Sequence, residues 1–465
     1  MAKTRVRLLL AWVVTGVLAL GCAAAAAWAV PTWNEAQNLQ RQATTPTLDM
    51  APTPAPGTDD GAPVIPEDLG PALDEVLDSL DQGTVSAQVF DAHTGEVLYS
   101  REASASRVPA SNMKLLVDYA VLATAPHARF STSVRLTDTS TLALVAGGDT
   151  LLVPGESQPG EVMGHAGVET LAERTIAALA EQGKSGQAFT VNLDTTIFTG
   201  SDLNPDWAQE DIDSGFISSI TPLAFYSHYS PGSDGAASTS RPKNAPKQVQ
   251  QTLVDALNQL GADRGLTFTT GQQLTDPAGG SELARVESAT AAEQSALMMQ
   301  ESDNSLAETL GRNLSVARGG AGSTDGAITA VRETLQAGGL PTDYTQVDIS
   351  GLSMNNRVSN ELLTALALRA VNGSAAERLA LNGLPVAGYS GTLGLASRFN
   401  DADESAGRGV VRAKTGTLNS VLSLTGYTVT DSGRPLVFSV MLNDLEDADA
   451  AKNTIDRFAA RLTDR

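Results

Sequence analysis

The sequence predicts an α+β protein in which both ends of the chain contribute strands to one antiparallel sheet. Residues 84–90 alternate apolar side chains on one face, as a strand with one buried face does, and short apolar segments near the C-terminus are also typical of strands. Turn-forming residues separate several of these segments. Five strands are expected, at residues 84–90, 97–99, 410–414, 421–430 and 436–442. The chain between the two groups then has to supply a helical lobe and an insertion.

Helices dominate the rest of the chain, because apolar residues recur there every three or four positions. Helices are expected at residues 73–80, 168–182, 248–260, 326–338, 360–371 and 448–462, with one or two more over 291–314. Short strands are expected at 133–136, 142–145 and 189–193. Residues 200–247 are rich in Ser, Gly, Asp and Pro and are expected to form loops. We therefore predict a catalytic domain made of residues 70–132 and 286–465, interrupted by an inserted domain at 133–285.

The N-terminus predicts export from the cytoplasm. Residues 1–30 contain three basic residues followed by an uncharged apolar run long enough to span a bilayer, and the basic flank favours a cytoplasmic N-terminus. A cleavable signal is the rival interpretation, since residues 27–29 resemble a cleavage site, and lipidation at Cys22 is a third. Residues 31–69 are rich in Pro, Thr and Ala and predict an extended linker. All three interpretations place the remainder of the chain outside the cytoplasm, anchored or secreted.

Composition excludes several classes of function. The 465-residue chain carries 31 basic and 53 acidic residues, a formal charge of −22, which argues against nucleic acid as a partner. The single cysteine excludes an intrachain disulfide. The four histidines show no metal-ligand spacing, so neither a metal nor a cofactor is expected.

Ser111 and Lys114 are the first candidate catalytic residues. A spacing of three places both on one helix face, one turn apart. If the helix starts at Ser111, its hydroxyl lies at the positive end of the helix dipole, beside an amine that can accept its proton. The apolar run after Lys114 predicts that this helix is buried inside a domain.

Two further short motifs could complete one site with this pair. The three motifs are Ser111-x-x-Lys114, Ser302-Asp303-Asn304 and Lys414-Thr415-Gly416. Each alone is a weak signal, because similar patterns recur at residues 240–243, 353–355 and 184–186. The context differs: the 240–243 copy lies in a polar loop and contains a proline, and the 184–186 copy follows a helix directly. By contrast, we expect Ser302 inside a helical segment and Lys414 at the end of a strand.

Several longer stretches extend this pattern in the same order. They lie at residues 108–116, 147–149, 302–308, 350–359, 384–393 and 412–417. With them the chain resembles the low-molecular-mass class C penicillin-binding proteins, the D-alanyl-D-alanine carboxypeptidase/endopeptidase family. The resemblance implies a serine β-lactamase/transpeptidase-like fold: a five-stranded antiparallel sheet flanked by helices, a helical lobe, and an inserted domain between the first and second motifs. Ile349 and Met354 depart from the Gly and Arg common in the family.

The resemblance also implies roles for the motif residues. Ser111 would attack the carbonyl between two terminal D-alanines, with Lys114 as a neutral base whose pKa is depressed by burial and by a nearby cation, Lys414. Ser302 would relay the proton to the departing amine, and Asn304 would bind the peptide backbone. The terminal carboxylate would contact the strand Lys414-Thr415-Gly416-Thr417, and the amides of Ser111 and Thr417 would form the oxyanion hole.

A further resemblance concerns a side pocket for the substrate. In this family an acidic residue and an aromatic residue five positions later can bind the side-chain amine of the stem peptide's diamino acid. Asp211 and Phe216, following Trp207, have this spacing. An ordinary loop is the alternative interpretation.

The sequence therefore predicts an extracytoplasmic serine D,D-peptidase that cleaves peptidoglycan stem peptides and is acylated by β-lactams. D-Ala-diamino acid cross-links are possible further substrates. Peptidoglycan stem peptides, β-lactams and, through the N-terminal segment, a membrane are the expected partners. A serine β-lactamase or esterase of the same fold and a catalytically degenerate cell-wall-binding module are the alternatives. An α/β-hydrolase is disfavoured because the chain contains no G-x-S-x-G sequence.

Overall fold

The computed structural model describes residues 69–463. The expected N-terminal segment 1–30 and the linker up to residue 68 lie outside the described residues. Within residues 69–463, no helix combines the length and the apolar character needed to cross a membrane.

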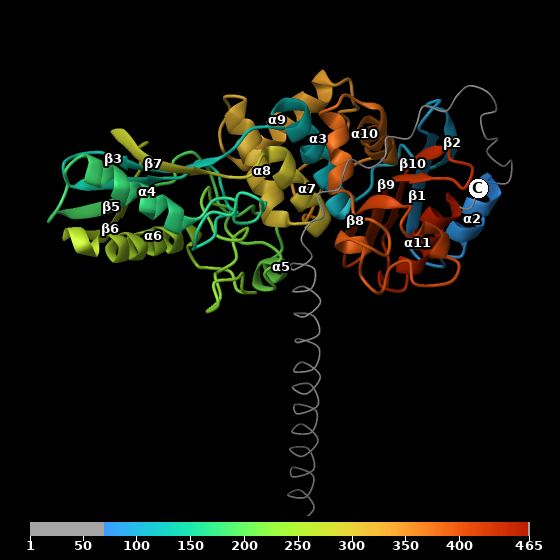
Figure 1. The fold of residues 1–465 in the computed structure, drawn as a ribbon. Helices are drawn as coiled ribbons and strands as arrows, with labels where there is room; N and C mark the ends of the chain where they lie inside the picture. The colour runs from blue at the N-terminus through green and yellow to red at the C-terminus, as the bar shows by residue number, and fades with distance from the viewer. Residues whose placement is uncertain (1–68, 464–465) are drawn as a thin grey trace, which may run out of the picture. The chain divides into compact units, whose positions relative to one another are not determined.

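A five-stranded antiparallel sheet joins the two ends of the described chain, in the order β2-β1-β10-β9-β8 (Figure 1). Its strands are β1 (Thr84–Asp91), β2 (Val97–Arg101), β8 (Arg412–Leu418), β9 (Val421–Val429) and β10 (Pro435–Asn443). Strand β1 pairs with β10 in the register Ala87 to Val440, so the expected sheet built from both ends is confirmed. Strand β8 lies at one edge and pairs only with β9 within this sheet.

Alternation along β10 divides its side chains between two cores. Leu436, Phe438 and Val440 pack in the core that includes α2 (Leu69–Asp78) and α11 (Lys452–Arg461). On the opposite face, Val437 and Met441 belong to the core of the helical lobe. Burying both faces explains why these strands are almost continuously apolar.

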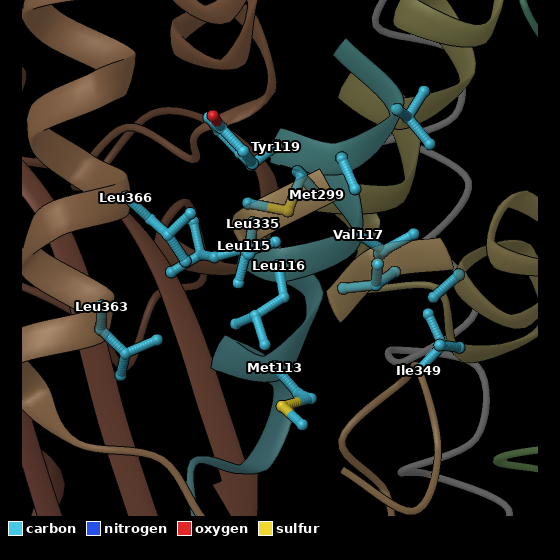
Figure 2. Close-up of a cluster of buried hydrophobic side chains, with 14 of the residues drawn as sticks. Met113, Leu115, Leu116, Val117, Tyr119, Met299, Leu335, Ile349, Leu363 and Leu366 are labelled. Carbon is cyan, nitrogen blue, oxygen red and sulfur yellow. The ribbon is translucent and has the colours of Figure 1, made fainter. Parts of the chain in front are cut away.

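The helical lobe surrounds one central helix, α3 (Lys114–Thr124), of which the first nine residues are all buried. The other helices of the lobe are α7 (Ala291–Glu301), α8 (Asn304–Ala317), α9 (Thr324–Ala337) and α10 (Asn360–Asn372). Figure 2 shows side chains of these elements, among them Met299, Leu335 and Leu366, around Leu115 and Leu116 of α3. The prediction of a buried helix after Lys114 is confirmed.

A second, mixed sheet is formed by the middle of the chain, in the order β6-β5-β4-β3-β7. Its strands are β3 (Ser131–Leu136), β4 (Thr141–Val145), β5 (Ala188–Asp194), β6 (Thr267–Gln273) and β7 (Ser281–Glu287). Helices α4 (Val168–Glu181) and α6 (Ala245–Gly261) pack against it, while α5 (Gln209–Asp213) is a short helix within the loop-rich stretch. The sequence did not predict the edge strands β6 and β7, because they are largely exposed and carry few apolar residues. The domain boundaries at 133 and 285 stay a prediction.

Candidate active site

Ser111 lies in a short 3-10 turn, Ala110–Met113, that leads directly into α3. The α-helix thus begins at Lys114, not at Ser111 as expected. Ala110 has a left-handed φ of 48°, an uncommon conformation for a residue with a side chain and one that concentrates at functional sites. This bend precedes Ser111, whose side chain is half-buried.

Strand β8 approaches this turn closely at Gly416. A Cβ atom at Gly416 would lie 2.8 Å from the Pro109 carbonyl oxygen and 3.0 Å from the Ser111 nitrogen. The neighbouring Ser423 of β9 donates a 2.6 Å hydrogen bond to the same Pro109 carbonyl. Only glycine permits this approach, so the Lys-Thr-Gly strand and the serine turn form two sides of one site.

The Lys114 amine contacts three acceptors although the residue is fully buried. Its Nζ atom lies 3.1 Å from Ser111 Oγ, 2.7 Å from Asn304 Oδ1 and 2.7 Å from the Ser350 carbonyl oxygen. A neutral amine can donate to Asn304 and Ser350 and direct its lone pair at the Ser111 hydroxyl. The geometry therefore suits an amine that accepts the serine proton.

Burial lowers the pKa of Lys114 to about 8, from an ordinary value of 10.5. The charges of Asp348, Asp303 and Glu308 act in the opposite direction and favour the protonated amine. The expected lowering of the pKa by burial is thus present. The charges that act on Lys114 are these carboxylates, in place of the expected cation Lys414. An amine that titrates near 8 is well placed for proton transfer.

Lys414 is the second fully buried lysine of the site. Its Nζ donates to Ser302 Oγ at 2.9 Å and to the Thr415 carbonyl at 2.7 Å. Burial, and then the positive charge of Lys114, hold the pKa of Lys414 well below its ordinary value. Lys414 is the third residue of β8, and the strand continues to Leu418, so the expectation that it ends the strand is wrong.

Ser302 occupies the break between α7 and α8 rather than a helix interior. It adopts a left-handed conformation, φ 54° and ψ 36°, at the C-terminus of α7. Asp303 then caps α8 by accepting a hydrogen bond from the Leu306 amide. The break directs Ser302 to Lys414 and, two residues later, Asn304 to Lys114.

The remaining residues of the third motif line β8. Thr415 is buried, and its hydroxyl lies 2.7 Å from the hydroxyl of Thr392. Thr417 is exposed. Sequence reasoning assigned no role to Thr392, although the stretch 384–393 carried part of the family resemblance.

The Asp211 and Phe216 segment borders the site through its backbone. Asn304 Nδ2 donates to the Phe216 carbonyl at 3.0 Å, and the Phe216 amide donates to the Asp211 carbonyl at 2.9 Å. The Phe216 side chain is 59% exposed. Burial, and then the charge of Glu210, raise the pKa of Asp211.

Trp207 is buried, and its Nε1 donates to Asp348 at 3.0 Å, so it joins this segment to the loop that contacts Lys114.

The second copies at 240–243 and 184–186 contain no fully buried lysine, whereas Ser353 of the copy at 353–355 is buried and donates its amide to Asp348. Ser240 and Lys243 are both exposed in a loop, and Lys184 follows α4 in a turn. One group of carboxylates could bind a metal: Asp401, Asp403 and Glu404 bring oxygens within 4.8 Å of one another. None of these three carboxylates contacts the serines or lysines of the site.

The serine–lysine site occurs in a chain with many known relatives. Residues 69–233 and 230–464 match the model of the D-Ala-D-Ala carboxypeptidase 3 (S13) family. The chain is 33% identical over 400 residues to a carboxypeptidase of Mycobacterium tuberculosis, covering 84% of this chain and 82% of the relative. It is 31% identical to carboxypeptidase DacB of Mycolicibacterium smegmatis, covering 89% of each chain.

Solved structures show the same fold. The structure matches penicillin-binding protein 4 of Haemophilus influenzae with a TM-score of 0.67 at 18% identity, covering 84% of this chain and 98% of the other. The expected α+β architecture, with a five-stranded antiparallel sheet and a helical lobe, is therefore confirmed.

Proposed function

The chain belongs to the D-Ala-D-Ala carboxypeptidase 3 (S13) family, and we propose that its serine D,D-peptidase activity resides in Ser111 and Lys114. The observation that carries this assignment is the set of contacts around Lys114 Nζ. Asn304 Oδ1 and the Ser350 carbonyl oxygen accept hydrogen bonds from the amine, and its third contact is the Ser111 hydroxyl at 3.1 Å. Of the two Ser-x-x-Lys patterns, 111–114 has a buried lysine within hydrogen-bond distance of its serine, whereas Ser240 and Lys243 are both exposed.

The reaction then proceeds in two steps. Ser111 Oγ attacks the carbonyl carbon of the penultimate D-alanine while Lys114 Nζ takes the hydroxyl proton. The carbon–nitrogen bond breaks, and the proton taken by Lys114 passes through Ser302 to the leaving D-alanine amine, which returns Lys114 to its neutral form; Ser302 Oγ lies 2.9 Å from Lys414 Nζ. Water then hydrolyses the ester and regenerates Ser111.

The substrate carboxylate would be bound beside β8. Lys414, Thr415, Gly416 and Thr417 supply a cation, hydroxyls and backbone donors along one edge strand. The amides of Ser111 and Thr417 are the proposed oxyanion donors, and the close approach at Gly416 supports this role. Asn304 would orient the peptide.

The same site explains the proposed ligands and location. Asp211 and Phe216, tied to Asn304 through the Phe216 carbonyl, would contact the amine of the diamino acid. Peptidoglycan stem peptides are the substrate class, and β-lactams would acylate Ser111.

Such substrates indicate a location outside the cytoplasm, with residues 1–30 as the anchor or cleaved signal of the protein. We also propose the division into a catalytic domain, 70–132 with 286–465, and an inserted domain, 133–285.

Intact-mass spectrometry after incubation with benzylpenicillin tests the assignment. The wild type should gain one adduct, and Ser111→Ala should gain none. Ser240→Ala, in the second Ser-x-x-Lys pattern, is the matched control and should behave as the wild type. An adduct that survives on Ser111→Ala would contradict the role of this serine.

The same experiment separates the alternatives. A β-lactamase would release the adduct within seconds, whereas a peptidase should retain it for minutes or longer. A degenerate wall-binding module would form no adduct at all. Release of D-alanine from a peptide ending in D-Ala-D-Ala, lost in Ser111→Ala, would complete the test.

A further inference from the structure

Two fully buried carboxylates, Glu308 and Asp348, act on the Lys114 amine, and neither is among the proposed substrate-binding residues. Their charges both favour the protonated form of Lys114. Burying a carboxylate is costly unless it is paired or well hydrogen-bonded. The contacts of these two side chains therefore need an explanation.

Glu308 fixes the backbone of the loop that reaches Lys114. Its Oε1 atom accepts hydrogen bonds from the amides of Ile349 and Ser350, both at 2.9 Å. The carbonyl of the same Ser350 accepts the 2.7 Å hydrogen bond from Lys114 Nζ. One residue thus connects the Glu308 carboxylate to the amine.

Asn304 and Glu308 act from one face of α8. They are four residues apart, which places them one turn from each other on the same helix. Asn304 contacts Lys114 directly at 2.7 Å, and Glu308 contacts it through Ser350. The single helix α8 therefore positions both groups that accept hydrogen bonds from Lys114, Asn304 directly and the Ser350 carbonyl through Glu308.

Asp348 closes the loop and presses it against the serine turn. It accepts hydrogen bonds from the amides of Gly351 and Ser353, each at 2.8 Å. Gly351 has φ of 80°, and a Cβ atom there would lie 2.0 Å from the Ala110 carbonyl oxygen. The loop can hardly move without moving the turn that contains Ser111.

We propose that Glu308 is a positioning residue for Lys114: it fixes the Ser350 carbonyl that directs the amine toward Ser111, and its buried negative charge acts on the amine. The inference rests on the proposed roles of Ser111 and Lys114. It assigns a function to Glu308, the last residue of the stretch 302–308 that carried part of the family resemblance.

Both parts of the role have a basis in the surroundings. Burial, and then the charge of Asp348, raise the pKa of Glu308 to about 7, so it is charged in the range where Lys114 titrates. The other charged groups acting on this cluster are Asp303, beside Asn304, Lys414 on β8, and Arg312 one turn further along α8. Removing the Glu308 charge leaves fewer anions to stabilise the Lys114 ammonium.

The test compares Glu308→Gln with Glu308→Ala in the full-length protein, following β-lactam acylation against pH. The glutamine keeps an oxygen for the two amides and removes the charge. The plateau rate of Glu308→Gln should stay within about fivefold of the wild type. The apparent pKa of the acidic limb of its pH–rate profile should fall by about 0.5 to 1. Relative to plateau, acylation at pH 7.5, where Glu308 of the wild type is mostly charged, then rises about two- to threefold. The alanine also loses the amide contacts, and its plateau rate should fall about 100-fold.

Asp118→Asn is the matched control, because Asp118 is a fully buried carboxylate of α3 that accepts a hydrogen bond from Ser295 and does not contact Lys114. Its acidic limb should match the wild type. The inference would be overturned if the apparent pKa of the acidic limb were unchanged in Glu308→Gln, or if Glu308→Ala kept the wild-type plateau rate. Should Glu308→Gln fail to fold, Asp348→Asn should show the same downward shift, and an unmoved limb there would overturn it as well. If the wild type itself gains no adduct on Ser111, the proposed function fails instead.

Discussion

Lys114 and Lys414 are both fully buried in one site, yet the charges around them differ in sign. Lys114 is surrounded by Asp303, Glu308 and Asp348, which oppose the effect of burial and leave its pKa at about 8. The charge acting on Lys414 is the other lysine, which adds to the effect of burial. The two lysine side chains thus lie in different electrostatic environments, which suit them to different roles.

The difference indicates which lysine is the base. With a pKa of about 8 and a 3.1 Å contact to Ser111 Oγ, the Lys114 amine in its neutral form could accept the serine proton, as a general base requires. Burial and the charge of Lys114 both disfavour the protonated form of Lys414, and a nearby anion would favour it. A substrate carboxylate bound beside β8 would supply that negative charge, so we infer that Lys414 recognises substrate by gaining a partner.

Removing the base should give the largest effect. Lys114→Met keeps much of the side-chain volume and removes the amine, so acylation by penicillin should fall about 10³- to 10⁴-fold. Stopped-flow or quenched-flow acylation rates measure this loss. Lys243→Met, in the second Ser-x-x-Lys pattern, should retain the wild-type rate. A loss of less than tenfold in Lys114→Met would assign the base to another group.

Removing the second lysine should act mainly on carboxylate recognition. Lys414→Met should lower kcat/KM about 100-fold for a peptide ending in a free D-alanine carboxylate. The same peptide with an amidated C-terminus should already be a poor substrate of the wild type, and the variant should lower its turnover much less. Equal losses on both peptides would show that Lys414 does not read the carboxylate.

The pH dependence should follow Lys114. Only the neutral amine accepts the serine proton, and the neutral fraction rises with pH through a pKa of about 8. Acylation should therefore increase from pH 6 to pH 9, with the rate at pH 7 about tenfold below the plateau. A rate that is flat over this range, or that falls as the pH rises from 6 to 8, would contradict a Lys114 base.

The smallest effect is expected at the hydroxyl pair beside Lys414. Thr415→Val removes one hydroxyl of the 2.7 Å contact with Thr392, so KM for the peptide should rise about three- to tenfold with little change in kcat. Steady-state kinetics on the D-Ala-D-Ala peptide check this. A large loss of kcat would instead give Thr415 a part in the chemical step.

The sheet and the order of the motifs could be predicted from the sequence because they depend on local patterns. Residues 421–429 and 435–443 are buried along almost their whole length, as strands between two cores are, and the helix after Lys114 is mostly apolar. The edge strand Thr267–Gln273 escaped prediction because exposed strands need few apolar residues.

Other parts of the site could not be predicted for a physical reason. Serine is common within helices, so nothing in the sequence marks the left-handed break at Ser302. The third partner of Lys114 is the backbone carbonyl of Ser350, a group that every residue carries. Glu308 was visible only as part of a family stretch, and its burial beside Asp348 depends on the fold.

The contrast between the two lysines can be tested directly by titrating their amines. NMR detection of the Nζ resonances in the ligand-free protein, assigned with Lys114→Met and Lys414→Met, would give both pKa values. We predict that Lys114 titrates near 8, that Lys414 also lies well below 10.5, and that the pKa of Lys414 rises when a peptide ending in a D-alanine carboxylate binds. Two lysines that both titrate near 10.5, with no response to the peptide, would contradict the account.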